Sequence, residues 1–301
     1  MSKNSFKIIS DSTSSLDKAT REKYDLDYAR MLLSYGENNE ERFATLDYEN
    51  PSFSEYFNIM RGGERIYTDM VTADEYTNVF SKYLKEGLDV LYIGCSSKLS
   101  GSVELAKKLA PEIEKEFPGR KIYVVDALTS NAAQKYLVID AAKLRDEGKS
   151  IEEVYKWVEE NKYDYQNYAT VGTLTYLARA GRVKAAKAFF GNLFSVKPLL
   201  YNNRAGENVS YSKAKGRKGS IEALAQEIKK YITDPEKQEK IYIVHGDCLE
   251  DAIELKNKIM ELIPELKEIE VTELDPIVGA SCGPDTLIVG FKGKFVEEVS
   301  E

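Results

Sequence analysis

The chain has 301 residues, of which 43% are hydrophobic and 31% charged, a composition typical of a soluble globular protein with two domains rather than one. Its formal net charge of −8 argues against a general nucleic-acid-binding or anionic-membrane surface. Three cysteines without a close pair and a single histidine argue against a zinc site and suit a reducing cytoplasm, and no apolar run reaches the length of a membrane-spanning helix.

The first predicted strand is Phe6–Ser10, and an acidic, hydroxyl-rich loop, Asp11–Ser15, follows it. Loops at strand ends often line ligand sites in α/β folds, which makes Asp11 and Ser12 candidate ligand-binding residues. A turn with a helix cap explains the same residues equally well. A second apolar stretch covers Tyr28–Tyr35.

Two helix starts carry a hydroxyl three residues before a glutamate, in Pro51–Glu55 and Thr72–Glu75. The helix after Thr72 is predicted to run to Lys85, with Gly87 ending it.

A strand–serine–helix unit comes next, with a buried strand at Asp89–Gly94 and an amphipathic helix at Val103–Phe117. Small residues fill the junction: Ser96, Ser97, Ser100, Gly101 and Ser102. Unpaired N–H groups and the positive end of the helix dipole make such a junction suitable for a small anion. Capping of the helix by Ser100 or Ser102 is the alternative interpretation.

The strand Lys121–Asp126 and the helices that follow it, one ending near Arg145 and one capped by Ser150, continue the alternation. This alternation predicts parallel βαβ units with right-handed crossovers. Because the periodicity breaks near Lys162–Tyr168, we predict two domains, residues 1–165 and 166–301.

The second half begins with a predicted strand at Ala169–Thr173 and a predicted hairpin that joins Val196–Tyr201 to Glu207–Tyr211. Further along come a basic loop at Lys213–Lys218, a helix at Ser220–Thr233 and a strand at Ile241–Asp247. A second helix to about Leu262, a strand at Ile269–Leu274 and a glycine-rich turn at Gly279–Pro284 follow.

Taken in order, the motifs of the chain resemble those of the bacterial DegV family over almost the whole length. The matching pieces are Ser10–Ser14, Ser96–Gly101, Val125–Asp126 with Ser130 and Gln134, Leu174–Arg182, Val196–Pro198, Lys215–Lys218, His245–Asp247 and Ile277–Pro284. Each piece is a weak signal alone, and their order makes the combination specific.

The resemblance implies a two-domain α/β fold in which a parallel-sheet N-terminal domain and an α/β C-terminal domain hold a long-chain fatty acid in a tunnel between them. Members of the family include the lipid-binding, non-catalytic subunit of bacterial fatty acid kinase. That subunit presents the acyl carboxylate to a separate kinase subunit, and the acyl phosphate goes on to phospholipid synthesis. On this basis we expect no cofactor, no metal and no stable insertion into a membrane.

Residue by residue, the resemblance matches Thr68 and Ser100, with Ser97 and Gly101 beside them, to the carboxylate site, and Gly279 to a glycine bordering the head group. Arg182 matches an arginine associated with productive interaction with the kinase subunit. Arg217 in the basic loop is the second candidate to face a partner. The apolar stretch Ala185–Leu200 is a candidate tunnel lining, or else core packing of the second domain.

The chain departs from the family pattern near the head group. Thr68–Val71 reads Thr-Asp-Met-Val where Thr-Ser-Gln-Pro is usual, Ser281 replaces a histidine, and Ala180 replaces a glycine. Ser281 therefore offers a shorter donor than usual, and Asp69 adds a negative charge.

Two other functions stay open from the sequence. One is a carrier for a different apolar ligand without kinase coupling. The other is a phosphoryl-transfer or hydrolytic enzyme using Asp11, Asp126 and the Ser100 region, although the chain has no P-loop, no nucleophile elbow and no histidine besides His245. We expect His245 to make a structural hydrogen bond or to face a partner.

Overall fold

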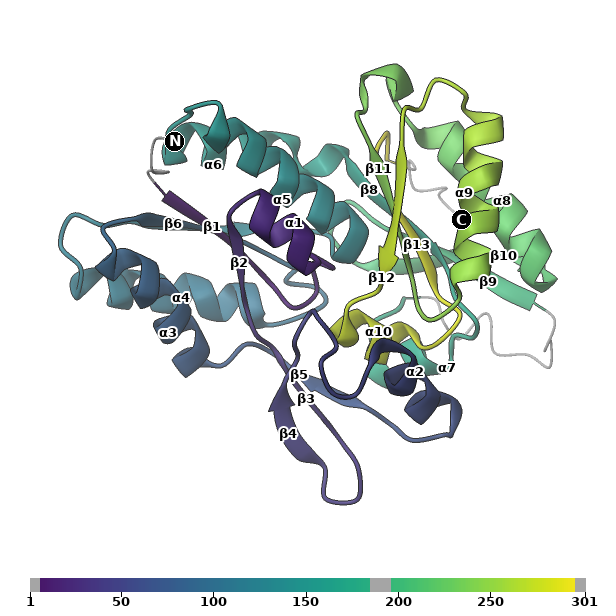
Figure 1. Cartoon of the computed structure of the whole chain (residues 1–301), viewed down its shortest axis with the longest axis horizontal. Helices are drawn as coiled ribbons and strands as arrows, with labels where there is room; N and C mark the ends of the chain where they lie inside the picture. The colour runs from purple at the N-terminus through teal and green to yellow at the C-terminus, as the bar shows by residue number, and fades with distance from the viewer. Residues whose placement is uncertain (1–5, 185–195, 296–301) are drawn as a thin grey trace.

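The computed structural model describes residues 6–184 and 196–295. Its two larger sheets lie side by side with helices on their faces (Figure 1). The predicted tunnel stretch Ala185–Leu200 therefore falls outside the described residues up to position 195. Among the described helices, none is both long enough and apolar enough to cross a membrane.

The first sheet is parallel and has four strands in the order β2-β1-β6-β7. Its strands span Leu26–Ala29, Phe6–Asp11, Asp89–Gly94 and Ile122–Asp126. Helices α3 and α4 cover one face, and α1, α5 and α6 lie on the other (Figure 1). These helices span Ala73–Lys85, Ser102–Lys115, Lys18–Lys23, Asn131–Asp146 and Ile151–Asn161. The alternation of strands and helices predicted this parallel sheet correctly.

The second sheet is mixed and has six strands in the order β10-β9-β8-β13-β11-β12. In chain order its strands are β8 to β13, at Tyr165–Thr170, Val196–Asn202, Asn208–Lys215, Ile241–His245, Ile269–Glu273 and Leu287–Lys292. Helices α8, Gly216–Tyr231, and α9, Leu249–Leu262, cover one face. Helix α5 packs on the other face.

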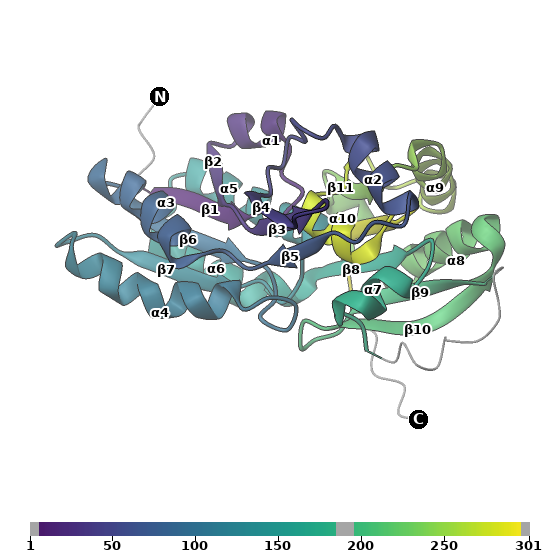
Figure 2. The same ribbon diagram turned by 90° about the horizontal axis from the view of Figure 1, so that it is seen from below.

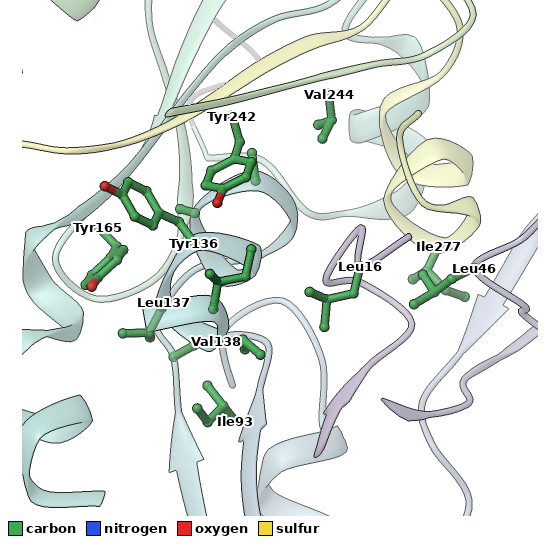
Figure 3. Packing of buried hydrophobic residues seen from close by; sticks show 14 of the residues in the cluster. Leu16, Leu46, Ile93, Tyr136, Leu137, Val138, Tyr165, Tyr242, Val244 and Ile277 are labelled. Carbon is green, nitrogen blue, oxygen red and sulfur yellow. The ribbon is translucent and has the colours of Figure 1, made fainter. Parts of the chain in front are cut away.

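Helix α5 is shared by the two sheets, because it contacts β1 as well as β8, β11 and β13. Nearly all of its residues are buried, which is unusual for a helix with solvent on one side and fits a helix enclosed by two layers. On the side of the second sheet, Tyr136 lies between Tyr165 and Tyr242, with ring centroids 5.3 and 5.2 Å away (Figure 3). This aromatic group fixes the position of α5 relative to the second sheet.

A third, three-stranded antiparallel sheet has the order β4-β3-β5, with strands at Glu40–Phe43, Leu32–Tyr35 and Tyr67–Asp69. The apolar stretch predicted at Tyr28–Tyr35 is divided between the end of β2 and β3. Helix α2, Phe53–Arg61, follows β4 and begins with the capping box predicted for Ser52 and Glu55. Its strand β5, which Figure 2 shows beside β3, carries Thr68.

Three predicted elements of the second half are wrong in the structure. Strand β8 begins at Tyr165, not Ala169, because the Tyr165 and Tyr168 rings are buried against aromatic neighbours on opposite faces of the sheet. The predicted basic loop does not exist, since β10 runs to Lys215 and α8 starts at the next residue. Gly216, with φ +68°, lets the backbone turn directly from strand to helix.

The predicted glycine-rich turn is the third error, because most of it is helix α10, Pro276–Cys282. Asp275 caps this helix by accepting a hydrogen bond from the Val278 amide at 2.7 Å, and Pro276 occupies the first turn, where its missing N–H costs nothing. A Cβ on Gly279 would lie 3.0 Å from the Phe57 ring, so the glycine lets α10 pack closely on α2. The helix ends at Gly283, with φ +82°.

Candidate functional site

The candidate site lies where the loops after β1, β6 and β7 meet α7, Thr175–Ala180, and α10. These three strands are parallel, so their carboxyl ends share one edge of the first sheet. That edge is the usual place for a ligand in an open α/β sheet.

Asp11, at the end of β1, holds the neighbouring loop together from behind. Its carboxylate accepts hydrogen bonds from the Thr13 amide at 3.0 Å, the Tyr92 hydroxyl at 3.0 Å and the Cys95 amide at 2.8 Å. The Ser12 hydroxyl is equally engaged, donating to a backbone carbonyl in one direction and accepting from a backbone amide in the other. Both side chains are buried and neither lines a cavity described below, whereas Thr13 does.

Asp126, at the end of β7, performs the same task for the serine loop. It accepts hydrogen bonds from the Ser97 amide at 3.2 Å and the Leu128 amide at 3.0 Å. The Ser96 hydroxyl donates to the carbonyl of Gly206 at 2.7 Å, which ties this loop to the β9–β10 hairpin. Ser97 is thus held beside the site but does not line its cavities.

Ser100 stands at the start of α4, and its hydroxyl lies 2.9 Å from that of Ser102 and accepts from the Ser102 amide at 3.3 Å. Ser102 in turn accepts from the amide of Val71 at 3.2 Å. The residue that caps α4 is Gly101, which makes no side-chain cap. The helix therefore begins with a hydroxyl pair and with its dipole directed at the site.

Beside Ser100 opens a cavity with an empty volume of about 710 Å³, part of it open to solvent, which we call the central cavity. Hydroxyl and other polar side chains occupy one group of its lining positions: Thr13, Thr68, Asp69, Ser100, Ser130, Arg182, Asn208 and Ser281. Apolar side chains fill another group: Met31, Met70, Leu99, Leu177, Ile277 and Val278. The cavity thus combines hydrogen-bond donors with an apolar surface.

A second, smaller hollow, with an empty volume of about 350 Å³ that includes open solvent, adjoins the first over the second sheet, and we call it the sheet cavity. The two share lining residues Ser130, Leu177, Asn208, Val278 and Cys282. The apolar lining of the sheet cavity comes largely from one small hydrophobic cluster, separate from the main core, formed by Val171, Leu174, Leu177, Leu200 and Cys282. The pair of cavities therefore passes from a polar end to an apolar one.

On the outer side of the central cavity lies a third hollow, the arginine pocket, named for Arg65, Arg179 and Arg182 in its lining. It shares Thr68, Arg182 and Ser281 with the central cavity. The Arg182 Nε donates to the Leu99 carbonyl at 3.2 Å, which places this guanidinium over the serine loop.

The other predicted site residues are distributed as follows. Gly101, Thr68 and Ser281 line the central cavity with Ser100, but Gly279 faces the Phe57 ring on the other side of α10. Arg182 lies at the junction of two hollows, as described above. Arg217 is on α8 and pairs with Asp251 at 2.7 Å, away from both cavities.

Asp69 is exposed and forms no ion pair among the described residues, which agrees with the first of two expected arrangements, a side chain that points to solvent or one that pairs with a lysine or arginine. Its exposed carboxylate accepts from the amide of Met70 at 2.7 Å, so it stabilises its own turn. His245 makes the structural hydrogen bond expected of it, accepting at Nδ1 from the Cys248 amide at 3.3 Å. Burial lowers the pKa of His245, which keeps the ring neutral.

The site has little of what nucleophilic catalysis needs. Burial raises the pKa of the Cys282 thiol to about 12 and that of Cys95 well above its usual value, so both thiols stay protonated and unreactive. The carboxylates of Asp11 and Asp126 are occupied by backbone and hydroxyl donors. No group of acidic, histidine and cysteine side chains within the described ranges is arranged to hold a metal ion.

Several lining residues were missed from the sequence. Arg65, which precedes β5, and Arg179 of α7 carry no local signal that they converge, because only the folded chain brings them together, where Arg65 donates to the Arg179 carbonyl at 3.2 Å. Asn167 lies in the stretch that was assigned to a domain boundary. Strand alternation from Tyr165, had it been recognised, would have placed Asn167, Ala169 and Val171 on one face.

Comparison with known proteins identifies the fold. A model of the DegV family of uncharacterised proteins matches residues 5–294. The chain is 36% identical over 288 residues to a DegV domain-containing protein of Clostridium perfringens, covering 96% of this chain and 97% of that protein.

Two further relatives are described by a ligand. One is a fatty acid-binding protein of Thermotoga maritima, 29% identical over 289 residues that cover 95% of this chain and 96% of that protein. The other is the solved structure of a fatty-acid-binding DegV family protein from Thermus thermophilus, with a TM-score of 0.82, 25% identity and coverage of 95% and 99%. With a family match over nearly its whole length and this close a relative, the chain belongs to the DegV family.

Proposed function

We propose that this protein binds a long-chain fatty acid, with the carboxylate beside Ser100, Thr68 and Ser281 and the acyl chain in the sheet cavity. The observation that carries the proposal is that a hydroxyl-lined cavity adjoins a more apolar one and shares five lining residues with it. A fatty acid has the same division into a polar head and an apolar chain. The descriptions of the Thermotoga and Thermus relatives support the same ligand.

The head group needs partners because a bare carboxylate costs many kcal/mol to bury. Hydroxyls provide them without a second buried charge, and the N-terminus of α4, a helix of 14 residues, adds a favourable dipole. The chain supplies most of the affinity, at about 0.8 kcal/mol per buried methylene, or on the order of 10 kcal/mol gross for sixteen carbons before ordering costs.

Titration of lipid-stripped protein with palmitate tests the proposal. We expect saturable binding, and we expect Ser100→Ala to weaken it by roughly 1–3 kcal/mol, since a charged acceptor then lacks a donor. Ser281→His should preserve or tighten binding by restoring a longer donor, provided that the ring fits. Ser97→Ala is the matched control, because Ser97 neighbours the site without lining it.

Absence of uptake of palmitate or oleate by well-folded protein would refute fatty acid binding. If Ser100→Ala binds like the parent while Ser281→His abolishes binding, the carboxylate lies elsewhere in the cavity.

We further propose that the bound carboxylate is presented to a separate fatty acid kinase subunit in the cytoplasm, for acyl phosphate formation that feeds phospholipid synthesis. The arginine pocket supports this, because it adjoins the head-group residues and its guanidinium groups suit phosphate or an acidic partner surface. On this view the protein is a non-catalytic binding subunit.

Replacing Arg182 with alanine should lower acyl phosphate formation with the cognate kinase subunit on the order of tenfold or more, through loss of a charge-assisted donor. Palmitate affinity should change less than it does in Ser100→Ala. Arg120→Ala serves as control, because Arg120 lies at the amino end of β7, the edge opposite the site. A large loss of palmitate binding with kinase coupling intact would contradict this role.

A further inference from the structure

The floor of the sheet cavity is a patch of the second sheet that is mostly apolar and carries two asparagines, Asn167 and Asn208. Alternation along β8 places Asn167 and Ala169 on the same face, with Val171 continuing the row, and all three line the cavity. Leu200 of β9 and Ile288 of β13 flank Ala169 on either side in the ladder and line the cavity too. Ser130, Asn131 and Asn208 line the cavity as well, so what sets Asn167 apart is the state of its hydrogen bonds.

The Asn167 amide has one end satisfied and one end free. Its Nδ2 donates to the carbonyl of Ser130 at 3.3 Å, which fixes the orientation of the amide. Its Oδ1 is buried and has no hydrogen-bond partner in the described parts of the chain, and the residue is 6% exposed. A buried amide oxygen without a donor is an uncommon and costly arrangement.

The side-chain amide of Asn208, the asparagine that lines both cavities, already has hydrogen-bond partners. Asn208 donates from Nδ2 to the Arg182 carbonyl at 2.9 Å and accepts at Oδ1 from Asn202 at 2.7 Å. Among the described residues that line either cavity, Asn167 Oδ1 alone is a buried side-chain oxygen or nitrogen without a partner. The residue Asn167 lines the sheet cavity but not the central cavity, so a ligand that occupies both would meet Asn167 with its chain and not with its head group.

We infer that the preferred ligand is a fatty acid that carries a hydroxyl group within its chain, whose O–H donates a hydrogen bond to Asn167 Oδ1. The inference rests on the proposed binding of fatty acids and names their class. A site built to accept a hydrogen bond discriminates strongly against an analogue that lacks the donor, since its own polar group is then left unpaired. Asn167 is on this view a specificity-determining residue.

The test compares four acids of equal chain length on lipid-stripped protein by calorimetric titration: octadecanoic acid, its 10-hydroxy and 12-hydroxy derivatives, and 12-oxooctadecanoic acid. We expect at least one hydroxy acid to bind on the order of tenfold more tightly than octadecanoic acid. The oxo acid, which only accepts hydrogen bonds, should bind more weakly than the hydroxy acid at the same carbon.

The variant Asn167→Leu keeps a side chain of similar size and removes the acceptor. It should reverse the preference, so that octadecanoic acid binds more tightly than either hydroxy acid. Gln166→Leu is the matched control, because Gln166 alternates to the other face of β8 and should leave the preference unchanged.

Equal or weaker binding of both hydroxy acids to the natural protein would overturn the inference and assign Asn167 Oδ1 to an ordered water only. The comparison of octadecanoic acid with its two hydroxy derivatives on the natural protein decides this even if Asn167→Leu fails to fold. If octadecanoic acid binds and the hydroxyl group does not change the affinity, the proposed fatty acid binding is supported and the preference for hydroxy acids is refuted. If none of the acids binds, the proposed function itself fails.

Discussion

Replacing Lys135 with methionine is expected to lower the free energy of unfolding by about 3 kcal/mol at neutral pH, at the lower end of what breaking a buried ion pair costs. Lys135 lies in α5 with its side chain fully buried. Its ammonium group donates to Asp17 at 2.7 Å and to Glu270 at 2.9 Å. Because Asp17 precedes α1 and Glu270 is in β12, this one cation joins α5 to both halves of the molecule.

The loss should depend on pH in a defined direction. Burial is the largest single influence and disfavours the charged forms of Asp17 and Glu270. Lys135, together with Thr20 at Asp17 and Lys240 at Glu270, outweighs it, so the pKa of each carboxyl is lowered from its ordinary 3.8 or 4.5. A lowered acid pKa stabilises the fold above the pKa of the unfolded chain and ceases to do so as the pH falls through the folded pKa. The difference between natural protein and variant should therefore be full at pH 7 and narrow below about pH 4.

Urea unfolding at a series of pH values measures both effects. Lys107→Met is the matched control, since Lys107 pairs with Glu104 on the exposed surface of α4, where such pairs contribute about 0–1 kcal/mol. Equal loss in the two variants, or a Lys135→Met deficit that grows in acid, would rule out a buried charge link between the halves.

The first sheet could be predicted because its signals are local. Three of its strands, β1, β6 and β7, are short and mostly apolar runs, and α3, which packs on this sheet, has a side-chain cap at Thr72 and a glycine stop at Gly87. Strand β13 was missed although it pairs with β8 and β11 in the middle of the second sheet. Its sequence, Leu-Ile-Val-Gly-Phe-Lys, is apolar, but no turn chemistry pairs it with a neighbour in sequence, since its partners lie far along the chain.

The candidate site divides in the same way. Ser100 and Gly101 were recognised because strand, serine loop and helix follow one another directly, and the structure brings them to the cavity. At the apolar end, Leu200 falls within the stretch named as a candidate tunnel lining, whereas Leu177 and Ile288 were missed because they come from other elements that only the fold brings together. Gly279 was misjudged as part of a turn for a related reason, since the close packing of Phe57 that requires it comes from α2.

Replacing Gly290 with alanine is the other change from which we expect a large loss, about 3 kcal/mol or more in the free energy of unfolding. A Cβ at this position would lie 2.4 Å from the carbonyl carbon of Ala132 and 2.6 Å from the amide nitrogen of Ala133. These are backbone atoms of the first turn of α5, which cannot rotate away as a side chain could. Gly290 also stands opposite Asn167 in the β8–β13 ladder.

The clash should therefore push the start of α5, and Ser130 with it, away from the sheet cavity, and palmitate affinity should fall together with stability. Gly219→Ala is the matched control, because its nearest neighbour would be the Cβ of Ala214 at 4.0 Å and it lies within α8. There alanine should raise stability by about 0.5–1 kcal/mol through a lower entropic cost of ordering the helix. Urea unfolding of both variants, followed by palmitate titration, decides the matter. A Gly290→Ala protein as stable as the parent would mean that α5 does not approach β13 as closely as described. The residues assigned to the lining of the sheet cavity would then be wrong.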